Sequence, residues 1–433
     1  MHSPDLAPSP PVRHSPVVPP SRAAAPDLAR GVMLLLIAVA NVSWYLWGHQ
    51  TQPASAHPVD GNPLDRALAA LTILFVDARI YPMFAFLFGY GMVQFARSRE
   101  ERGVPPQRVD RMLLRRHWWL IAFGAMHAAL LFSGDVLGAY GLAGLLLGWL
   151  LFRRSDRAAA ITVWSLVAVF VSVTVLGMMS AALLSLLPPE VLAADEGAEA
   201  FAVGPDLLNG QAVYWQSLLI RLGLWLAGTV GTVIGLAVPI CVLFGWLAAR
   251  KQWLEEPERH QGTLRTVAVW GILVGVLGAL PQMLIYLDVL PVPDALSWSL
   301  AGLASVTGVA GGIGYAALFG LLARALRGRI PAALRPVAAV GRRSLTFYLL
   351  QSVIFAPLLA AWGLGLGPDF NTATAFALAL GVWLLSLGLA EILERRNARG
   401  PAEVVLRRLT YGGDGRSSAR GAGTTTPSDK EIP

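Results

Sequence analysis

The chain has 433 residues, of which 55% are hydrophobic and only 14% charged, and its mean hydropathy is +0.56. A soluble globular domain carries about 25% charged residues, so the composition excludes that class and indicates a polytopic membrane protein. The net charge of +7 does not indicate a nucleic-acid-binding protein, because the basic residues lie in short clusters between apolar runs.

About ten apolar segments are each close to the roughly 20 residues that cross a bilayer. They predict an all-α fold, a polytopic membrane helical bundle of about ten transmembrane helices that forms one domain, residues 28–411. The flanking residues 1–27 and 412–433 are rich in Pro, Ser or Gly and lack an apolar core, so disordered cytoplasmic tails are expected there. The expected spans are 29–48, 66–96, 116–133, 135–152, 158–187, 213–249, 264–287, 296–324, 342–364 and 371–393.

The apolar run 66–96 is interrupted by two charged residues, Asp77 and Arg79. Charged side chains within a membrane span are rare and costly, so the run is not expected to cross the bilayer as one helix. We expect residues 65–77 to form a short helix near the membrane surface, with the true span starting at about Ile80.

Basic residues crowd every second connection between the expected spans, and the connections in between carry almost none. Cytoplasmic loops of membrane proteins carry such an excess of Lys and Arg. The pattern predicts that both termini are cytoplasmic and that the chain crosses the membrane several times. The crowded connections lie between Arg97 and Arg116, Arg153 and Arg157, Arg250 and Arg265, and Arg324 and Arg343.

One apolar stretch, GAMHAALLFSGDVLGAY at 124–140, contains a histidine and an aspartate. At 1.5 Å rise per residue, His127 lies roughly 16 Å along a helix from the cytoplasmic Arg116, near the middle of the membrane. Asp135 then falls at the outer turn between two spans. Two interpretations stay open for each residue: His127 is a core histidine or a functional group, and Asp135 is a helix N-cap or its partner.

Asn41 of the first span and Arg79 at the start of the second reach the same outer half of the membrane. Such groups cost several kcal/mol in lipid, so they should face a protein interior or a water-filled cavity. Eight residues of continuous helix would separate His127 from Asp135 by about 12 Å. Contact between them therefore requires a break at Ser133–Gly134 that folds the aspartate back.

Two further patterns have simpler explanations. The glycines of GGIGYAALFG (311–320), and the regularly spaced Gly138, Gly141, Gly144 and Gly148, predict close helix–helix contacts rather than a phosphate-binding loop. His49 and His57 lie near Asp60 in the first outer connection, but without a recognised ligand spacing, so no metal site is predicted.

Five motifs then follow one another along the chain: RGVMLLLIAVANV (30–42), FVDARIYPMFAFLFGYGM (75–92), RRHWWLIAFGAMHAALLFSGDVLGAYGLAGLLL (115–147), GRRSLTFYLLQS (341–352) and GPAEVVLRRLTYG (400–412). In this order they resemble the YeiB-like family of bacterial membrane proteins, whose common region is the domain of unknown function 418. That family in turn resembles the transmembrane acyltransferase superfamily in its helical bundle and in the RG…N element of the first span.

The resemblance implies transfer of an acyl group from a cytoplasmic thioester to a hydroxyl or amine of an extracytoplasmic envelope glycan or lipid. The donor it implies is acetyl-CoA or another acyl-CoA, and no metal is expected. The location it implies is a bacterial cytoplasmic membrane, which the chain crosses many times. Two departures bear on the choice of substrate: Phe347 stands where many relatives have Asn, and DVLGAY is looser than the usual pattern.

Acyl transfer to an alcohol needs a general base that titrates near pH 7, and imidazole is the side chain closest to that requirement. His127 is the candidate base or transient acyl carrier, and Asp135 is the candidate for orienting it. Asn41 and Arg79 are candidates for stabilising a developing oxyanion. The candidate donor-binding residues are Arg342 and Arg343, whose charges could hold phosphates or only set the topology, and Tyr348 and Gln351, deeper on the same helix.

A secondary transporter or flippase is the competing function, in which the same polar groups would bind a substrate or relay protons. The sequence has no internal repeat and no matched pair of Pro- or Gly-broken spans, which many secondary carriers show. The expected partners are the lipid bilayer, a small-molecule acyl donor and an envelope acceptor. Whether the chain forms a homodimer stays open.

Overall fold

The computed structural model describes residues 24–52, 55–186, 203–292, 294–326 and 330–411, so nearly all of the two predicted tails falls outside it. The described residues are mainly helical and contain no β-strand, which confirms the all-α fold; their one β-type pairing is an isolated bridge. The helices are α1 (Ala24–Val42), α2 (Pro63–Phe75), α3 (Ile80–Glu100), α4 (Pro106–Leu130), α5 (Leu137–Leu151), α6 (Asp156–Leu184), α8 (Pro205–Asn209), α9 (Tyr214–Ile234), α10 (Ala237–Arg250), α11 (Gln261–Tyr286), α12 (Asp294–Ala325), α13 (Arg335–Arg342), α14 (Ser344–Leu359), α15 (Thr372–Arg395) and α16 (Pro401–Tyr411), with short 3-10 turns η1 (Ser43–Tyr45), η3 (Ala332–Leu334) and η4 (Gly367–Asp369).

Seven helical segments of the described chain are long and apolar enough to cross a membrane, by length and composition. Of the three shorter apolar helices, α5 and α14 lie within two further expected spans, and α10 lies in the same expected span as α9. The chain is therefore a multi-pass helical membrane protein.

The expected span 213–249 is not a single helix. α9 ends at Ile234, α10 starts at Ala237, and Leu236 between them has a φ of 68°. The residues on both sides are apolar, so hydropathy gives no sign of the break. The consequence is that α10 leaves the line of α9 and packs against α3.

The interruption expected near Asp77 is confirmed, because α2 ends at Phe75 and α3 starts at Ile80. The Asn62 side chain caps α2 by accepting hydrogen bonds from the backbone N–H groups of Leu64 and Asp65, at 2.9 and 3.1 Å. Ala78, in the turn between the helices, has a φ of 55°. This turn holds Asp77 and Arg79 at the end of a short helix rather than inside a span.

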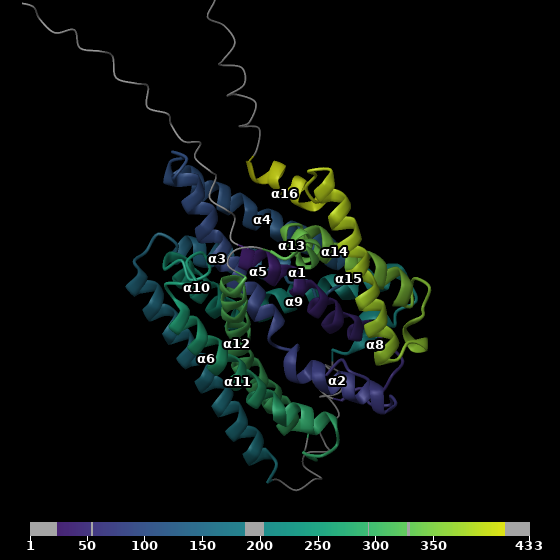
Figure 1. Ribbon diagram of the computed structural model, residues 1–433. Coiled ribbons are helices and arrows are strands. Elements are labelled where there is room, and N and C mark those ends of the chain that lie inside the picture. The colour runs from purple at the N-terminus through teal and green to yellow at the C-terminus, as the bar shows by residue number, and fades with distance from the viewer. Residues whose placement is uncertain (1–23, 53–54, 187–202, 293, 327–329, 412–433) are drawn as a thin grey trace, which may run out of the picture.

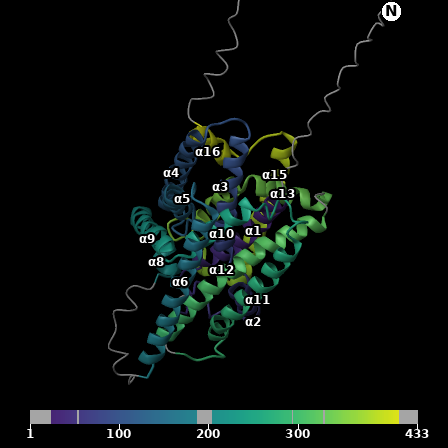
Figure 2. The same ribbon diagram turned by 90° about the vertical axis from the view of Figure 1, so that its left-hand side faces the viewer.

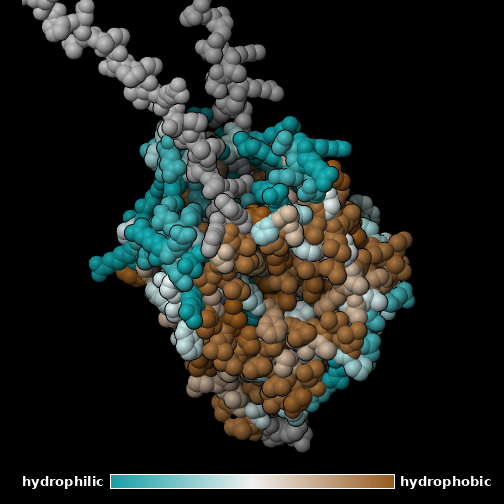
Figure 3. Space-filling model, in the orientation of Figure 1, coloured by the Kyte–Doolittle hydropathy of each residue, from teal (hydrophilic) through white to brown (hydrophobic). Residues whose placement is uncertain are grey.

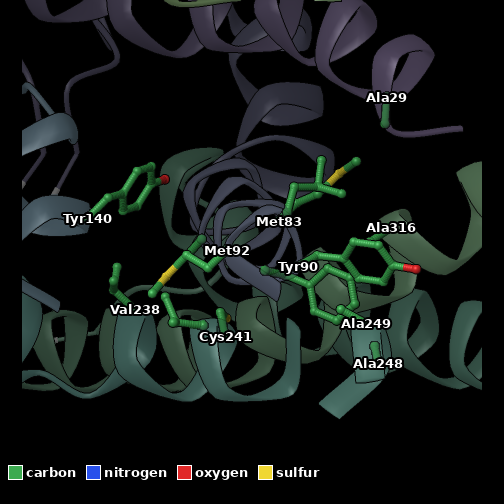
Figure 4. Packing of buried hydrophobic residues seen from close by; sticks show 14 of the residues in the cluster. Ala29, Met83, Tyr90, Met92, Tyr140, Val238, Cys241, Ala248, Ala249 and Ala316 are labelled. Carbon is green, nitrogen blue, oxygen red and sulfur yellow. The ribbon is translucent and has the colours of Figure 1, made fainter. Parts of the chain in front are cut away.

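The contact between α3 and α10 is the centre of the packed core. A Cβ atom on Gly89 would lie 2.3 Å from the backbone oxygen of Val242, and one on Gly245 would lie 2.2 Å from that of Phe86. The two backbones therefore approach each other where neither helix carries a side chain. Figure 4 shows Met92 and Tyr90 of α3 packed near Val238, Cys241 and Ala249 of α10.

The arginine-rich connections gather at one end of the bundle. Arg153 pairs with Glu100 and Asp110, and Arg250 pairs with Asp156, so the second, fourth and sixth connections are joined by ion pairs. α16 lies at this end and α2 at the opposite end (Figures 1 and 2). Figure 3 shows hydrophilic surface gathered at the α16 end and hydrophobic surface over the middle. The α16 end corresponds to the side that the charge pattern predicts to be cytoplasmic.

Candidate functional site

His127 and Asp135 meet at the turn between α4 and α5. His127 Nδ1 and Asp135 Oδ2 are 2.8 Å apart, and both residues are buried. The other carboxylate oxygen, Oδ1, accepts a hydrogen bond from the backbone N–H of Gly138 at 3.1 Å. The turn thus folds the aspartate back as contact required, and Asp135 serves both as partner of the histidine and as acceptor for the first turn of α5.

A buried arginine of α9 contacts the turn between α4 and α5. Arg221 is fully buried, and its guanidinium donates to the backbone oxygens of Ala128 and Ala129 at 3.2 and 2.9 Å. These oxygens belong to the last turn of α4, whose carbonyls lack partners within the helix. Arg221 was not among the predicted site residues, although a charged residue inside the expected span 213–249 indicates a polar partner without naming it.

Tyr348 of α14 completes the cluster around the pair. Its ring lies edge-on to His127 with the centroids 5.3 Å apart, and its hydroxyl lies 3.4 Å from Asp135 Oδ2. The backbone N–H of Val136 donates to the same hydroxyl at 3.4 Å. His127 Nε2 is buried with no hydrogen-bond partner among the described residues. Tyr348 lines the two cavities described below, whereas His127 and Asp135 line neither.

An outer cavity of about 800 Å³ lies between α1, the α2–α3 turn, α5 and α12. It is lined by the predicted residues Asn41 and Arg79, and also by His57 and Asp77. His57 Nε2 lies 2.8 Å from Asp77 Oδ2, and His57 Nδ1 lies 3.3 Å from Ser43 Oγ. A second histidine–aspartate pair therefore faces this cavity.

This pair was not predicted from the sequence, because the fold determines which aspartate each histidine contacts. His57 is near Asp60 in the chain, but it is His49 that bonds Asp60, at 3.1 Å. The available signal was the unusual Asp77 in an apolar run, which indicates a polar partner without naming it.

Arg79 is fully buried beside the same cavity. Its guanidinium donates to the backbone oxygens of Ile73 at 3.1 Å, and to those of Asp77 and Gly275. It thereby fixes the end of α2 and the turn that carries Asp77. Three carbonyls accept hydrogen bonds from its Nη atoms, so Arg79 holds the turn in place, while its Nε is buried without a hydrogen-bond partner among the described residues.

An inner cavity of about 1330 Å³ opens at the end of the bundle that carries α16. Of the four predicted donor-binding residues, Arg342 and Tyr348 line it. Arg343 is not among its lining residues; it donates to the backbone oxygen of Ala398 and pairs with Glu394 at 2.8 Å. Gln351 is also absent from the lining, and it donates to the backbone oxygen of Leu34 at 2.8 Å.

The two cavities are separated by very little protein. Four residues line both of them: Ile37 of α1, Val136 and Tyr140 next to and within α5, and Tyr348 of α14. The Tyr140 hydroxyl donates to the backbone oxygen of Tyr81 at 2.9 Å. We call these four residues the shared wall. It lies directly beside the His127–Asp135 pair, which contacts Tyr348.

Glu255, in the connection between α10 and α11, lines the inner cavity. Its carboxylate accepts hydrogen bonds from Gln94 Nε2 at 2.8 Å and from the Tyr90 hydroxyl. Burial disfavours the charged carboxylate and raises the pKa of Glu255 to about 7. The inner cavity therefore contains a carboxyl group that titrates near neutral pH.

Comparison with known proteins agrees with the resemblance seen in the motifs. A profile of the family described as "Protein of unknown function (DUF418)" matches residues 248–413. The uncharacterized protein YeiB of Escherichia coli is 27% identical over 402 residues, which cover 89% of this chain and 95% of that protein. The uncharacterized protein YxaH of Bacillus subtilis is 25% identical over 359 residues, or 80% of this chain and 83% of that protein. The chain is therefore similar to YeiB and YxaH over most of its length, and its residues 248–413 match the DUF418 family.

Proposed function

We propose that this protein moves an acyl group from a cytoplasmic acyl-CoA such as acetyl-CoA to a hydroxyl or amine of an envelope glycan or lipid outside the cytoplasmic membrane. The observation that carries the proposal is the pair of back-to-back cavities that share one thin wall. A donor in the inner cavity and an acceptor in the outer cavity would meet at this wall without either crossing the membrane.

The chemistry requires few groups. The acceptor oxygen or nitrogen attacks the thioester carbonyl, the carbon–sulfur bond breaks, and the proton lost by the acceptor passes through a base to the departing thiolate. An imidazole held by a carboxylate suits that base, because the carboxylate fixes the tautomer and stabilises the protonated ring. Hydrogen-bond donors beside the carbonyl, such as the Tyr348 hydroxyl and the Asn41 amide, would stabilise the oxyanion.

Two histidines are candidates for the base. His57 faces the outer cavity with its ring bonded to Asp77. His127, the candidate from the sequence, is bonded to Asp135 and reaches the wall through Tyr348. We propose that His57 takes the proton from the acceptor and that the His127–Asp135 pair positions the Tyr348 hydroxyl.

The test uses the purified full-length chain in nanodiscs with acetyl-CoA labelled in the acetyl group. Wild-type protein is expected to release free CoA and to transfer the label to an added amino sugar or to lipid. His57→Ala should lower the rate by roughly a hundredfold or more, and His127→Ala should lower it less. His49→Ala is the control, because His49 bonds Asp60 and lines neither cavity. If His127→Ala alone abolishes transfer, the base is His127; no turnover by the wild type contradicts the function itself.

The same pair of cavities is also compatible with one alternative function, that of a secondary transporter. Carriers of the alternating-access type place one site between an inward and an outward opening, and the shared wall could part in such a cycle. In that case liposomes containing the protein would take up a solute, and acetyl-CoA would be neither bound nor cleaved.

A further inference from the structure

Two arginines of the inner cavity converge on one face of α3. Arg30 reaches from α1, and its Nη2 would lie 3.7 Å from a Cβ atom on Gly91. Arg116 reaches from α4, with its guanidinium carbon 5.9 Å from the centre of the Phe88 ring. Phe88 and Gly91 are one helical turn apart on α3, so the two guanidinium groups meet above the same short surface.

The positive charges of Arg30 and Arg116 repel each other. The Arg30 and Arg116 side chains are close enough to interact electrostatically, and all four residues of this surface line the inner cavity. Arg30 has a carboxylate nearby, Asp27 at 3.6 Å, whereas Arg116 forms no ion pair with the described part of the chain. Two like charges held close together raise the local positive potential, which favours the binding of an anion beside them.

Setting the membrane topology does not account for this arrangement. Arginines that only follow the positive-inside rule extend toward bulk water or lipid headgroups. Arg408 of α16 and Arg395 of α15 lie at the same end of the bundle and are exposed. Arg30 and Arg116 are partly buried instead and line the inner cavity, where guanidinium groups can bind phosphate oxygens through paired hydrogen bonds.

We propose that Arg30 and Arg116 form an anion site that binds a phosphate or pyrophosphate group in the inner cavity. The group belongs either to a soluble phosphorylated ligand or to a lipid headgroup, and its identification with the acyl-CoA donor rests on the function proposed above. Arg342 is not a member of the site, because it pairs with Glu394 at 2.7 Å.

The experiment measures binding by tryptophan fluorescence or calorimetry, using the full chain in nanodiscs of neutral lipid. The probes are inorganic pyrophosphate, coenzyme A, and pantetheine, which lacks phosphate. Pyrophosphate and coenzyme A are expected to compete, and both should weaken steeply as salt is raised. The double variant Arg30→Gln/Arg116→Gln should bind both roughly tenfold or more weakly.

Three controls make the result decisive. Arg395→Gln/Arg408→Gln removes the same charge from the same end and should leave binding unchanged. Arg30→Lys and Arg116→Lys keep the charge and guard against misfolding, and they should give smaller losses. Nanodiscs with phosphatidylglycerol test the lipid source: a headgroup ligand would compete with pyrophosphate there.

Pyrophosphate binding that survives the Gln double variant, or binding of pantetheine as tight as that of coenzyme A, would overturn the anion site. These outcomes are distinct from failure of the proposed function. Arginine-dependent pyrophosphate binding without acetyl transfer would retain the site and reject the acyltransferase. Acetyl transfer with an unchanged KM for acetyl-CoA in the double variant would retain the acyltransferase and reject Arg30 and Arg116 as the binding site of its donor.

Discussion

Asp135 shows how one side chain can serve two purposes that the sequence left as alternatives. One oxygen bonds His127 and the other accepts from the N–H of Gly138 at the start of α5. The structural role and the candidate functional role are therefore compatible. The third residue of the cluster is Tyr348, whose hydroxyl lies 3.4 Å from the Asp135 carboxylate.

The first residue-scale prediction concerns this hydroxyl. Tyr348→Phe keeps the ring against His127 but removes the hydroxyl of this shared-wall residue, so acetyl transfer should fall about tenfold to a hundredfold. The melting temperature should change little, since only weak hydrogen bonds are lost. Tyr315→Phe is the matched control, because its hydroxyl donates to the backbone oxygen of Phe75 at 2.8 Å and Tyr315 lines neither cavity. Equal losses in both variants would show that the effect is structural.

The second concerns Glu255 in the inner cavity. Its pKa is raised from 4.5 to about 7 by burial, so the folded protein holds a proton that the unfolded chain has lost between these pH values. Stability should therefore decrease as the pH rises from about 4.5 to about 7 and then level off. Melting temperatures measured across this range should show a smaller decrease for Glu255→Gln. A pH profile identical to that of the wild type would contradict the assignment.

At the scale of helices, the sequence predicted a helix break where charged residues interrupt an apolar run. The break before Ile80 was predictable because Asp77 and Arg79 interrupt an apolar run, and the structure confirms it. The break at Leu236 was missed because its neighbours are all apolar, although Gly235 and Pro239 beside it are residues typical of helix ends. The His57–Asp77 pair depends on a turn and on a connection that meet only in the folded chain, so its spacing carries no signal.

The element-scale prediction tests the contact between α3 and α10. A Cβ atom at Gly89 would collide with the backbone of Val242, so Gly89→Ala must push the helices apart and should cost about 1–3 kcal/mol. Gly223 of α9 is the control, because a Cβ atom there has no neighbour within 4 Å. Thermal unfolding in detergent should show a clear decrease for Gly89→Ala and none for Gly223→Ala. Equal melting temperatures would contradict the close packing.

At the scale of the whole molecule, the two cavities make the two ends of the bundle chemically different. The inner cavity carries arginines and lies at the α16 end, whereas the outer cavity carries the His57–Asp77 pair, and the shared wall is their common boundary. The sequence predicted the helical bundle and polar groups within it, and the sidedness that its charges indicate stays a prediction. It could not predict two cavities, since a cavity is what several helices leave between them.

Sided transfer is therefore the most direct test of the central claim. Proteoliposomes are prepared with an amino-sugar acceptor only inside and labelled acetyl-CoA only outside, and molecules inserted with the α16 end outward are isolated by an affinity tag at the C-terminus. The account predicts acetylated sugar inside the vesicles, no entry of intact acetyl-CoA, and a rate lowered roughly a hundredfold or more by His57→Ala. Acetylation that requires donor and acceptor on the same side, or label that enters only as intact acetyl-CoA, would contradict it.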